Sequence, residues 1–384
     1  MQREYYLSLA KSGLHFPIGA DLVLKEYADH EEILRDGVRL GKVVAEAAER
    51  FHSPLAMPVM DLMLEKAFLL RAMGGVSEAD IPRWHFSACP TPEEISAIRR
   101  GIQGPLDPRL QANVDAVRYI AENTDRVPVG MGIGPFSLMT KLLADPITPV
   151  YVAGMGITAQ EDADVRSVET LLDLAVEVIL RSFKAQAEAG AKVFFIAEPA
   201  ANKVYISPKQ MAEGSDVFDR LVLANLRRIK AAMDKAGVDL FFHCCGELTD
   251  EMVKGFASLR PAVLSLGSSR ILWEDARIVP KDIVLYGNLP SKKFYSDDLV
   301  SVDDVRRMSR EFLANMEATG HPYILGTECD VLCVPGCEHT LMNKVMAVVN
   351  ATGEDECLIK ERNADEVLLP HPTHKKHEQV AMVG

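Results

Sequence analysis

The chain has 384 residues, of which 48% are hydrophobic and 25% are charged, and its formal net charge is −13. This composition fits one large globular domain or two ordinary ones and excludes long disordered tracts. The acidic balance argues against nucleic acid or an anionic membrane as a partner. The N-terminus has no apolar signal core, and no stretch reaches about 18 consecutive apolar residues, so we expect a cytoplasmic protein. Seven cysteines, several of them clustered, favour reduced thiols and metal ligation over a disulfide framework.

Residues 1–125 are predicted to form a mainly helical N-terminal extension. A strand-like apolar run at 55–62, with its best candidate strand at 56–60, interrupts the helical pattern. We expect this extension to pack on the domain that follows it. Helices are predicted at 31–50, 91–100 and 108–123.

Residues 126–384 have a different rhythm, in which short apolar runs alternate with longer amphipathic stretches. This alternation is typical of a parallel sheet with helical crossovers. Seven or so strands, with no glycine-rich dinucleotide loop among them, favour a closed (β/α)8 TIM-type barrel over an open doubly wound sheet. Predicted strands are 127–133, 192–197, 239–245, 262–266, 282–287 and 323–327, and predicted helices are 169–189, 217–236 and 305–319, each capped by Gly190, Gly237 or Gly320.

His243 and Cys245 end one predicted strand, and Cys329 follows the end of another. Because side chains alternate along a strand, His243 and Cys245 point the same way and Cys244 points oppositely. The carboxyl ends of barrel strands form one face, so the three residues are predicted to converge there. One imidazole and two thiolates are three of the four ligands of tetrahedral zinc, and an open fourth position is typical of catalytic zinc.

Other interpretations of these cysteines stay open at this point. A buried cysteine often acts as a small hydrophobic residue, and Cys333 and Cys337 lie near enough to Cys329 in the sequence to be rival donors. The mixed nitrogen and sulfur set favours zinc. An ion made electron-rich by two thiolates suits group transfer at sulfur or oxygen better than the generation of a hydrolytic hydroxide.

The His-x-Cys pair with its distant cysteine resembles the zinc signature of the cobamide-dependent methyltransferases in the uroporphyrinogen decarboxylase superfamily, a family of α/β barrels. The arginine-rich N-terminal loop of uroporphyrinogen decarboxylases proper has no counterpart here. The resemblance therefore implies a zinc enzyme that moves a methyl group between a small molecule and the cobalt of a corrinoid (cobalamin) on a separate partner protein. The same family order and spacing recur in the runs 134–138, 206–209, 286–289 and 326–330.

The runs 16–23 and 57–65 are more similar to the donor-demethylating members than to the thiol-methylating ones. The resemblance thus favours O-demethylation of a methoxylated aromatic compound. Methylation of a thiol by methylcobamide is the alternative within this branch. A metal-free decarboxylase on the same barrel and a zinc-stabilised binding protein without activity are alternatives outside it.

Four further residues are candidate catalytic groups. Glu198, at a strand end, is predicted to face the barrel mouth as the fourth zinc ligand or as a proton-transferring group, and Asp61 is a second candidate of this kind. A solvated carboxylate is the alternative for both. Asn288 and Tyr286 end another strand; Asn288 is predicted to orient the substrate, whereas Tyr286 is predicted either to join the site or to pack in the core.

Overall fold

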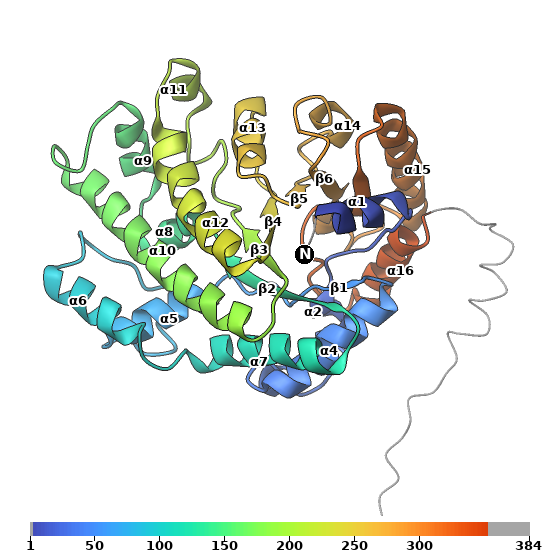
Figure 1. Ribbon diagram of the computed structural model, residues 1–384, viewed down its shortest axis with the longest axis horizontal. Coiled ribbons are helices and arrows are strands. Elements are labelled where there is room, and N and C mark those ends of the chain that lie inside the picture. The colour runs from blue at the N-terminus through green and yellow to red at the C-terminus, as the bar shows by residue number, and fades with distance from the viewer. Residues whose placement is uncertain (1–2, 352–384) are drawn as a thin grey trace, which may run out of the picture. The chain divides into compact units, whose positions relative to one another are not determined.

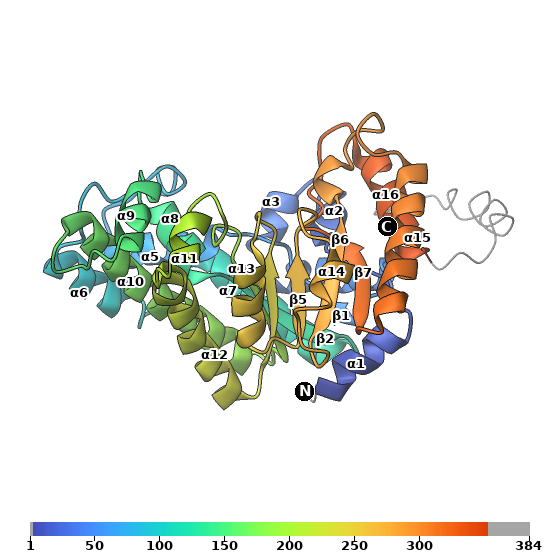
Figure 2. The ribbon, with the colours of Figure 1, turned by 90° about the horizontal axis from the view of Figure 1, so that it is seen from above.

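The computed structural model describes residues 3–351. Seven parallel strands form one sheet in sequential order, and the sheet curls into a half-barrel (Figures 1 and 2). The predicted α/β architecture is therefore confirmed. The strands are β1 (Leu55–Ala56), β2 (Val127–Ile133), β3 (Val193–Ala197), β4 (Asp239–Cys244), β5 (Val263–Leu266), β6 (Val284–Leu289) and β7 (Tyr323–Thr327).

The predicted closure with eight strands is the part of the barrel prediction that the described residues do not bear out. The segment at His15 lies where an eighth strand would pair with β7, but it forms only an isolated parallel bridge to Leu325. Phe16 N donates to Leu325 O at 3.2 Å. Pro17 follows and has no N–H to extend this ladder. Between β1 and β7 the described sheet has no pairing.

Proline also shortens the first strand. A strand was expected over 56–60, but β1 ends at Ala56, two residues before Pro58. Proline cannot donate to a strand ladder and is confined to edges and strand ends. β1 nevertheless pairs in parallel with β2, so the N-terminal extension contributes a strand to the sheet.

Helices follow the strands and cover the outer face of the sheet; α10 and α12, for example, pack outside β2–β4 in Figure 1. The expected caps Gly190, Gly237 and Gly320 have φ of 109°, 67° and 59°, left-handed conformations that glycine adopts without strain. α10 begins earlier than expected because the Asp162 side chain accepts hydrogen bonds from Asp164 N and Val165 N.

The predicted helix over 217–236 is α12 preceded by a π-helical turn, η1 (Asp219–Leu223). The short 3-10 helix η2 covers Ser291–Lys293. The α-helices are α1 (Arg3–Lys11), α2 (Ala20–Leu24), α3 (His30–Ile33), α4 (Gly37–Arg50), α5 (Leu64–Met73), α6 (Pro92–Gly101), α7 (Pro108–Asn123), α8 (Pro135–Leu142), α9 (Ile147–Gly154), α10 (Ala163–Glu188), α11 (Pro208–Ala212), α12 (Ala224–Ala236), α13 (Asp250–Ser258), α14 (Leu272–Asp275), α15 (Val302–Thr319) and α16 (Glu338–Val349).

Alternate residues of each strand pack into two different cores. On β4, Phe242 and Cys244 belong to the large core between sheet and helices, whereas Phe241 belongs to the smaller core inside the curved sheet. The His243 ring stacks on Phe195, another inner residue, with 5.5 Å between ring centroids. This alternation confirms that His243 faces inward and that Cys244 faces the helices.

The described residues up to Ala351 form one compact unit. The predicted division into an extension (1–125) and a barrel domain (126–384) stays a prediction, and the part of that barrel domain at 352–384 lies outside the described residues. No helix within residues 3–351 is both long enough and apolar enough to cross a membrane.

Candidate metal centre

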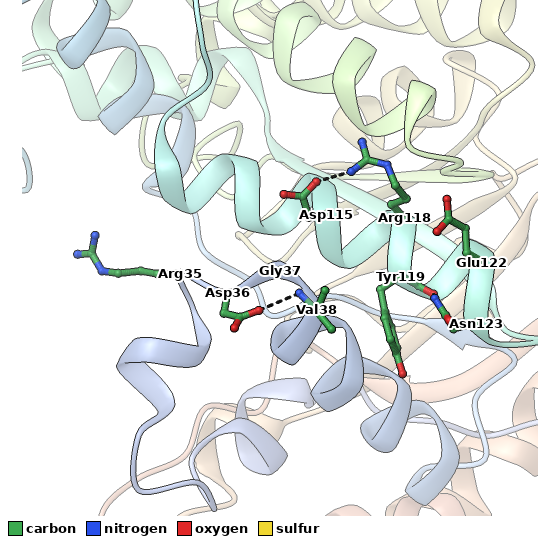
Figure 3. A pocket seen from close by; sticks show the side chains of 9 residues that line it. All are labelled: Arg35, Asp36, Gly37, Val38, Asp115, Arg118, Tyr119, Glu122 and Asn123. Carbon is green, nitrogen blue, oxygen red and sulfur yellow. Dashed lines mark hydrogen bonds and ion pairs between the residues drawn. The ribbon is translucent and has the colours of Figure 1, made fainter.

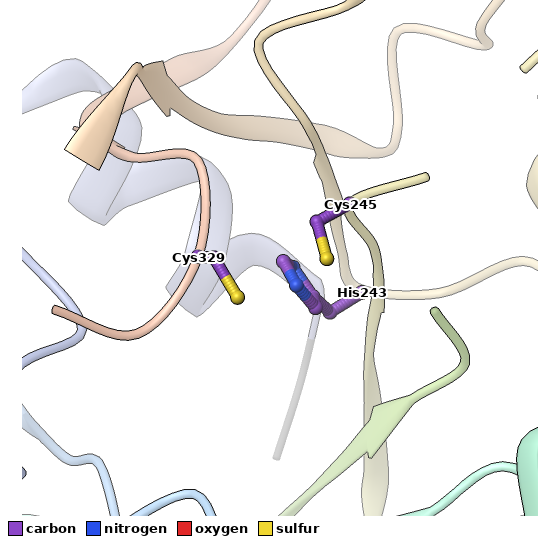
Figure 4. A group of neighbouring side chains, drawn as sticks. All are labelled: His243, Cys245 and Cys329. Atoms are coloured by element: carbon purple, nitrogen blue, oxygen red, sulfur yellow. The ribbon is translucent and has the colours of Figure 1, made fainter. Parts of the chain in front are cut away.

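The side chains of His243, Cys245 and Cys329 meet at the carboxyl end of the sheet (Figure 4). His243 is in the last turn of the ladder of β4, Cys245 follows that strand directly, and Cys329 lies two residues beyond β7. One ligand atom from each residue lies within 4.8 Å of the other two. The structure therefore brings together the three residues that the sequence predicted as metal ligands.

The imidazole of His243 is oriented for metal binding. It is fully buried, and its Nδ1 lies 2.8 Å from Ser265 Oγ on the neighbouring strand β5. Its Nε2 is also buried and has no hydrogen-bond partner among the described residues. A buried polar nitrogen without a partner is costly, and a metal ion at Nε2 would provide one. Partners of Nδ1 such as Ser265 are what fix the tautomer of metal-binding histidines.

The sulfurs of Cys245 and Cys329 interact directly. A hydrogen bond from the Cys329 thiol holds the pKa of Cys245 well below its usual range, against the effect of burial, and His243 and Lys292 lower it further. The same hydrogen bond, together with burial, raises the pKa of Cys329. Without a metal the pair thus shares one proton, and a bivalent cation would displace it. The donor set of one imidazole nitrogen and two sulfurs fits zinc.

The other cysteines do not join this group. Cys244 is fully buried, and its sulfur lies 3.8 Å from Ala201 O on the helical side of the sheet. Burial raises the pKa of the Cys244 thiol, which makes it a poor ligand. Cys333 and Cys337, the rival donors by sequence, lie outside the three-residue cluster. The structure therefore selects Cys329 from the three candidates in this part of the chain.

Glu328 ties together the loops around the centre. Its carboxylate is buried and accepts hydrogen bonds from Ser268 N at 3.1 Å and Ser268 Oγ at 2.7 Å, in the loop after β5. It also accepts one from Lys292 N at 3.4 Å, in the loop after β6. Sequence reasoning missed Glu328, Ser265 and Lys292 as site residues. A polar serine inside the apolar run of β5 was the signal for Ser265.

Comparison with known proteins agrees with this architecture. Residues 23–354 match the family model described as uroporphyrinogen decarboxylase (URO-D). The chain belongs to the uroporphyrinogen decarboxylase family. A search of curated protein sequences found no match.

Solved structures with other sequences share the fold of this URO-D family member. A methyltransferase from Methanosarcina mazei superposes with a TM-score of 0.63 at 17% identity, covering 91% of this chain and 98% of that one. A B12-independent methionine synthase from Shewanella sp. W3-18-1 in complex with selenomethionine gives 0.42 at 14% identity, covering 65% and 67%. The metallated homocysteine methyltransferase MmuM from Escherichia coli gives 0.26 at 12% identity, covering 73% and 93%. At these identities the first comparison establishes the fold.

Glu198, predicted as a fourth ligand or a proton-transferring group, is held elsewhere. Its backbone N donates to His243 O at 2.9 Å, yet its carboxylate points to the first turn of α8, where it accepts from Phe136 N at 3.1 Å and Ser137 N at 2.6 Å. Burial raises the pKa of Glu198 to about 7, although these hydrogen bonds oppose the shift. Its oxygens are not among the gathered ligand atoms. The structure thus places Glu198 at a helix N-terminus rather than at the metal.

Asp61, the second acidic candidate, is engaged in an ion pair. Its carboxylate lies 2.9 Å from the Arg109 guanidinium and accepts from Met63 N at 2.9 Å. It is largely shielded from solvent, so the solvated alternative does not apply. Like Glu198, it is outside the three-residue cluster.

Asn288 and Tyr286 lie on β6, near the centre but with partners of their own. The Asn288 amide donates to Gly267 O at 2.8 Å and Arg270 O at 2.9 Å, which fastens the loop after β5. The fully buried Tyr286 donates to Phe16 O at 2.8 Å, and its ring packs against other rings of the inner core. This arrangement agrees with the packing alternative for Tyr286. The substrate-orienting role of Asn288 stays a prediction.

A separate surface pocket lies between α4 and α7 (Figure 3). Its charged groups have internal partners: the Asp36 side chain caps α4, and Arg118 pairs with Asp115 on α7. It contains no cysteine or histidine. These features favour a structural crevice between helices over a second reactive site.

Proposed function

We propose that this URO-D family protein is a zinc-dependent methyltransferase. It would move a methyl group between a small molecule, with a methoxylated aromatic donor favoured, and the cobalt of a corrinoid on a separate protein. The observation that carries this proposal is the unpartnered, buried Nε2 of His243 beside the sulfurs of Cys245 and Cys329. The fold shared with a protein described as a methyltransferase supports it.

The residues that would hold zinc are His243, Cys245 and Cys329. A zinc ion bound there supplies a Lewis acid that polarises the departing oxygen of the methyl donor. In this direction the methyl carbon–oxygen bond breaks and a cobalt–carbon bond forms on the partner's corrinoid, with both electrons for the new bond coming from cobalt(I). Two sulfur anions balance the charge of a bivalent ion, which suits this use better than hydrolysis.

The surrounding residues keep this centre in place. Ser265 holds the imidazole through Nδ1, and the Phe195 ring covers one of its faces. The buried position of His243 excludes water from the nitrogen side of the centre. Such preorganised ligands avoid the cost of rearrangement during the reaction.

Exposed apolar side chains at the same end of the sheet suit a protein partner. Ile271, Leu299 and Leu332 are exposed by 43%, 51% and 58% and follow β5, β6 and β7. Exposed apolar groups near a reactive centre are typical of binding surfaces. We propose that the corrinoid protein docks over these loops, because its cobalt has to approach the metal centre from outside.

Thiol methylation in the reverse direction uses the same ligand set. A thiol would lose its proton, attack the methyl group of methylcobalt(III) and leave cobalt(I). The metal-free decarboxylase alternative leaves the His243 Nε2 without a partner, so the structure favours a metal-dependent reaction.

The proposal is tested by elemental analysis and a cobalamin assay on the same preparations. We expect about one zinc ion per chain in the wild type and little zinc in His243→Ala and Cys245→Ser. Cys244→Ala is the matched control, because this neighbouring sulfur faces the helices. Wild type and control should methylate cob(I)alamin from methoxyaromatic donors, or release methyl from methylcobalamin to thiols, whereas the ligand variants should do neither. Folded wild type without zinc, or activity that survives Cys245→Ser, would overturn the proposal.

A further inference from the structure

A lysine ammonium lies beside the sulfur pair of the metal centre. Lys292 belongs to η2, directly after β6, and its side chain is about half exposed at 50%. Its Nζ is 3.9 Å from Glu328 Oε2 and within hydrogen-bonding range of the Cys245 sulfur. The ammonium thus contacts both a buried carboxylate and a metal-ligating sulfur.

The charges around Lys292 keep it protonated. Burial alone would lower the pKa of Lys292, but the charges of Cys245, Glu328 and Cys329 raise it above its ordinary value. Glu328 is itself fixed by Ser268 in the loop after β5. The cation is therefore held by an anchored carboxylate on one side and by the Cys245 sulfur on the other.

We propose that Lys292 is a positioning residue that donates a hydrogen bond to the Cys245 sulfur and so makes a metal held by His243, Cys245 and Cys329 more electrophilic. An N–H donor withdraws electron density from a thiolate, and the thiolate then neutralises less of the metal's charge. Groups that contact the ligands in this way tune the properties of metal sites. The link to methyl transfer rests on the proposed function, whereas the effect on the sulfur does not.

The direct test uses cobalt(II) in place of zinc and reads the sulfur-to-cobalt charge-transfer absorption. Lys292→Met removes the donor and the charge at similar side-chain length, and Lys292→Arg restores both. Lys293→Met is the control, because Lys293 is in the same 3-10 helix and its side chain makes no hydrogen bond or ion pair with the described residues. Loss of the donor raises the energy of the sulfur electrons. The band of Lys292→Met should therefore move to longer wavelength, with one cobalt still bound.

The Arg variant and the Lys293 control should both keep the wild-type band. An unchanged band in Lys292→Met, or an equal shift in Lys293→Met, would overturn the inference. Circular dichroism of each cobalt-loaded variant verifies that the comparison is made on folded protein.

Methyl transfer separates this role from substrate binding. Lys292→Met should lower kcat by about 10-fold or more with little change in the KM for the methyl donor, because groups of this kind contribute about 10- to 100-fold. A rise confined to the KM of anionic donors would instead make Lys292 a substrate-binding group and overturn the positioning role. If the wild type transfers no methyl group, the proposed function fails, while the cobalt spectra still decide whether Lys292 acts on Cys245.

Discussion

The contact between Ser265 and His243 gives a prediction that isolates one hydrogen bond. Ser265 is fully buried, and its Oγ lies 2.8 Å from His243 Nδ1. With a metal on Nε2, the proton of the ring is on Nδ1 and has to be donated to Ser265. Ser265→Ala removes the acceptor without adding bulk, so the bound state contains a buried N–H without a partner.

The magnitude follows from the cost of such a group. A buried donor left without a partner costs about 1–3 kcal/mol, and each 1.4 kcal/mol corresponds to about tenfold in an equilibrium constant. We therefore expect zinc to bind Ser265→Ala about 10- to 100-fold more weakly than the wild type, which agrees with the usual effect of removing a partner of a metal-binding histidine. His243→Ala, which removes the ligand itself, should weaken binding further.

The assay is a competition titration with a chromophoric zinc chelator. Ser309→Ala is the matched control, since Ser309 on α15 is also fully buried but its Oγ has no hydrogen-bond partner in the described structure. The control should bind zinc as the wild type does. Wild-type affinity in Ser265→Ala, or equal weakening in Ser309→Ala, would show that the Ser265 contact does not orient the ligand.

Three other predictions concern stability and partner binding. Burial raises the pKa of Glu65 to about 7, so its folded form binds a proton that the unfolded chain has released, and its contribution to stability falls as pH rises from about 4.5 to 7; Glu65→Gln should show a smaller decrease in melting temperature over this range, and an identical pH profile would contradict the assignment. Leu332→Asp should raise the KM for the corrinoid protein but leave the rate with free cob(I)alamin unchanged, and a loss with both acceptors would argue against docking there. Asn288→Ala should lower the free energy of unfolding by about 1–3 kcal/mol, because two amide bonds to the loop 267–270 are lost. Reduced turnover at unchanged stability would instead favour the substrate-orienting role of Asn288.

Much of the local structure could be predicted from the sequence. The bounds of β2 and β7 agree with those expected from their apolar runs, and the three helix-capping glycines adopt the conformations assigned to them. The inward direction of His243 and the outward direction of Cys244 follow from the alternation of a single strand. These features depend on neighbours along the chain, which the sequence states directly.

Only the tertiary structure decided which distant groups meet. β4 and β7 are separated by two strands, and the curl of the sheet brings Cys329 to His243 and Cys245. The partners Ser265 and Glu328 come from β5 and from the end of β7, and no spacing in the sequence indicates their hydrogen bonds. The same holds for the closure of the barrel, because Pro17 limits the pairing of the N-terminal segment with β7.

Glu198 shows the limit most clearly. Its place at a strand end predicted a carboxylate facing the mouth, but the N–H groups at the start of α8 compete for that carboxylate and bind both of its oxygens. The sequence by itself thus determined the strands, their facing residues and the three metal ligands. The tertiary structure determined which polar groups each buried side chain has within reach, because a buried charge takes the nearest set of donors and these come from other parts of the chain.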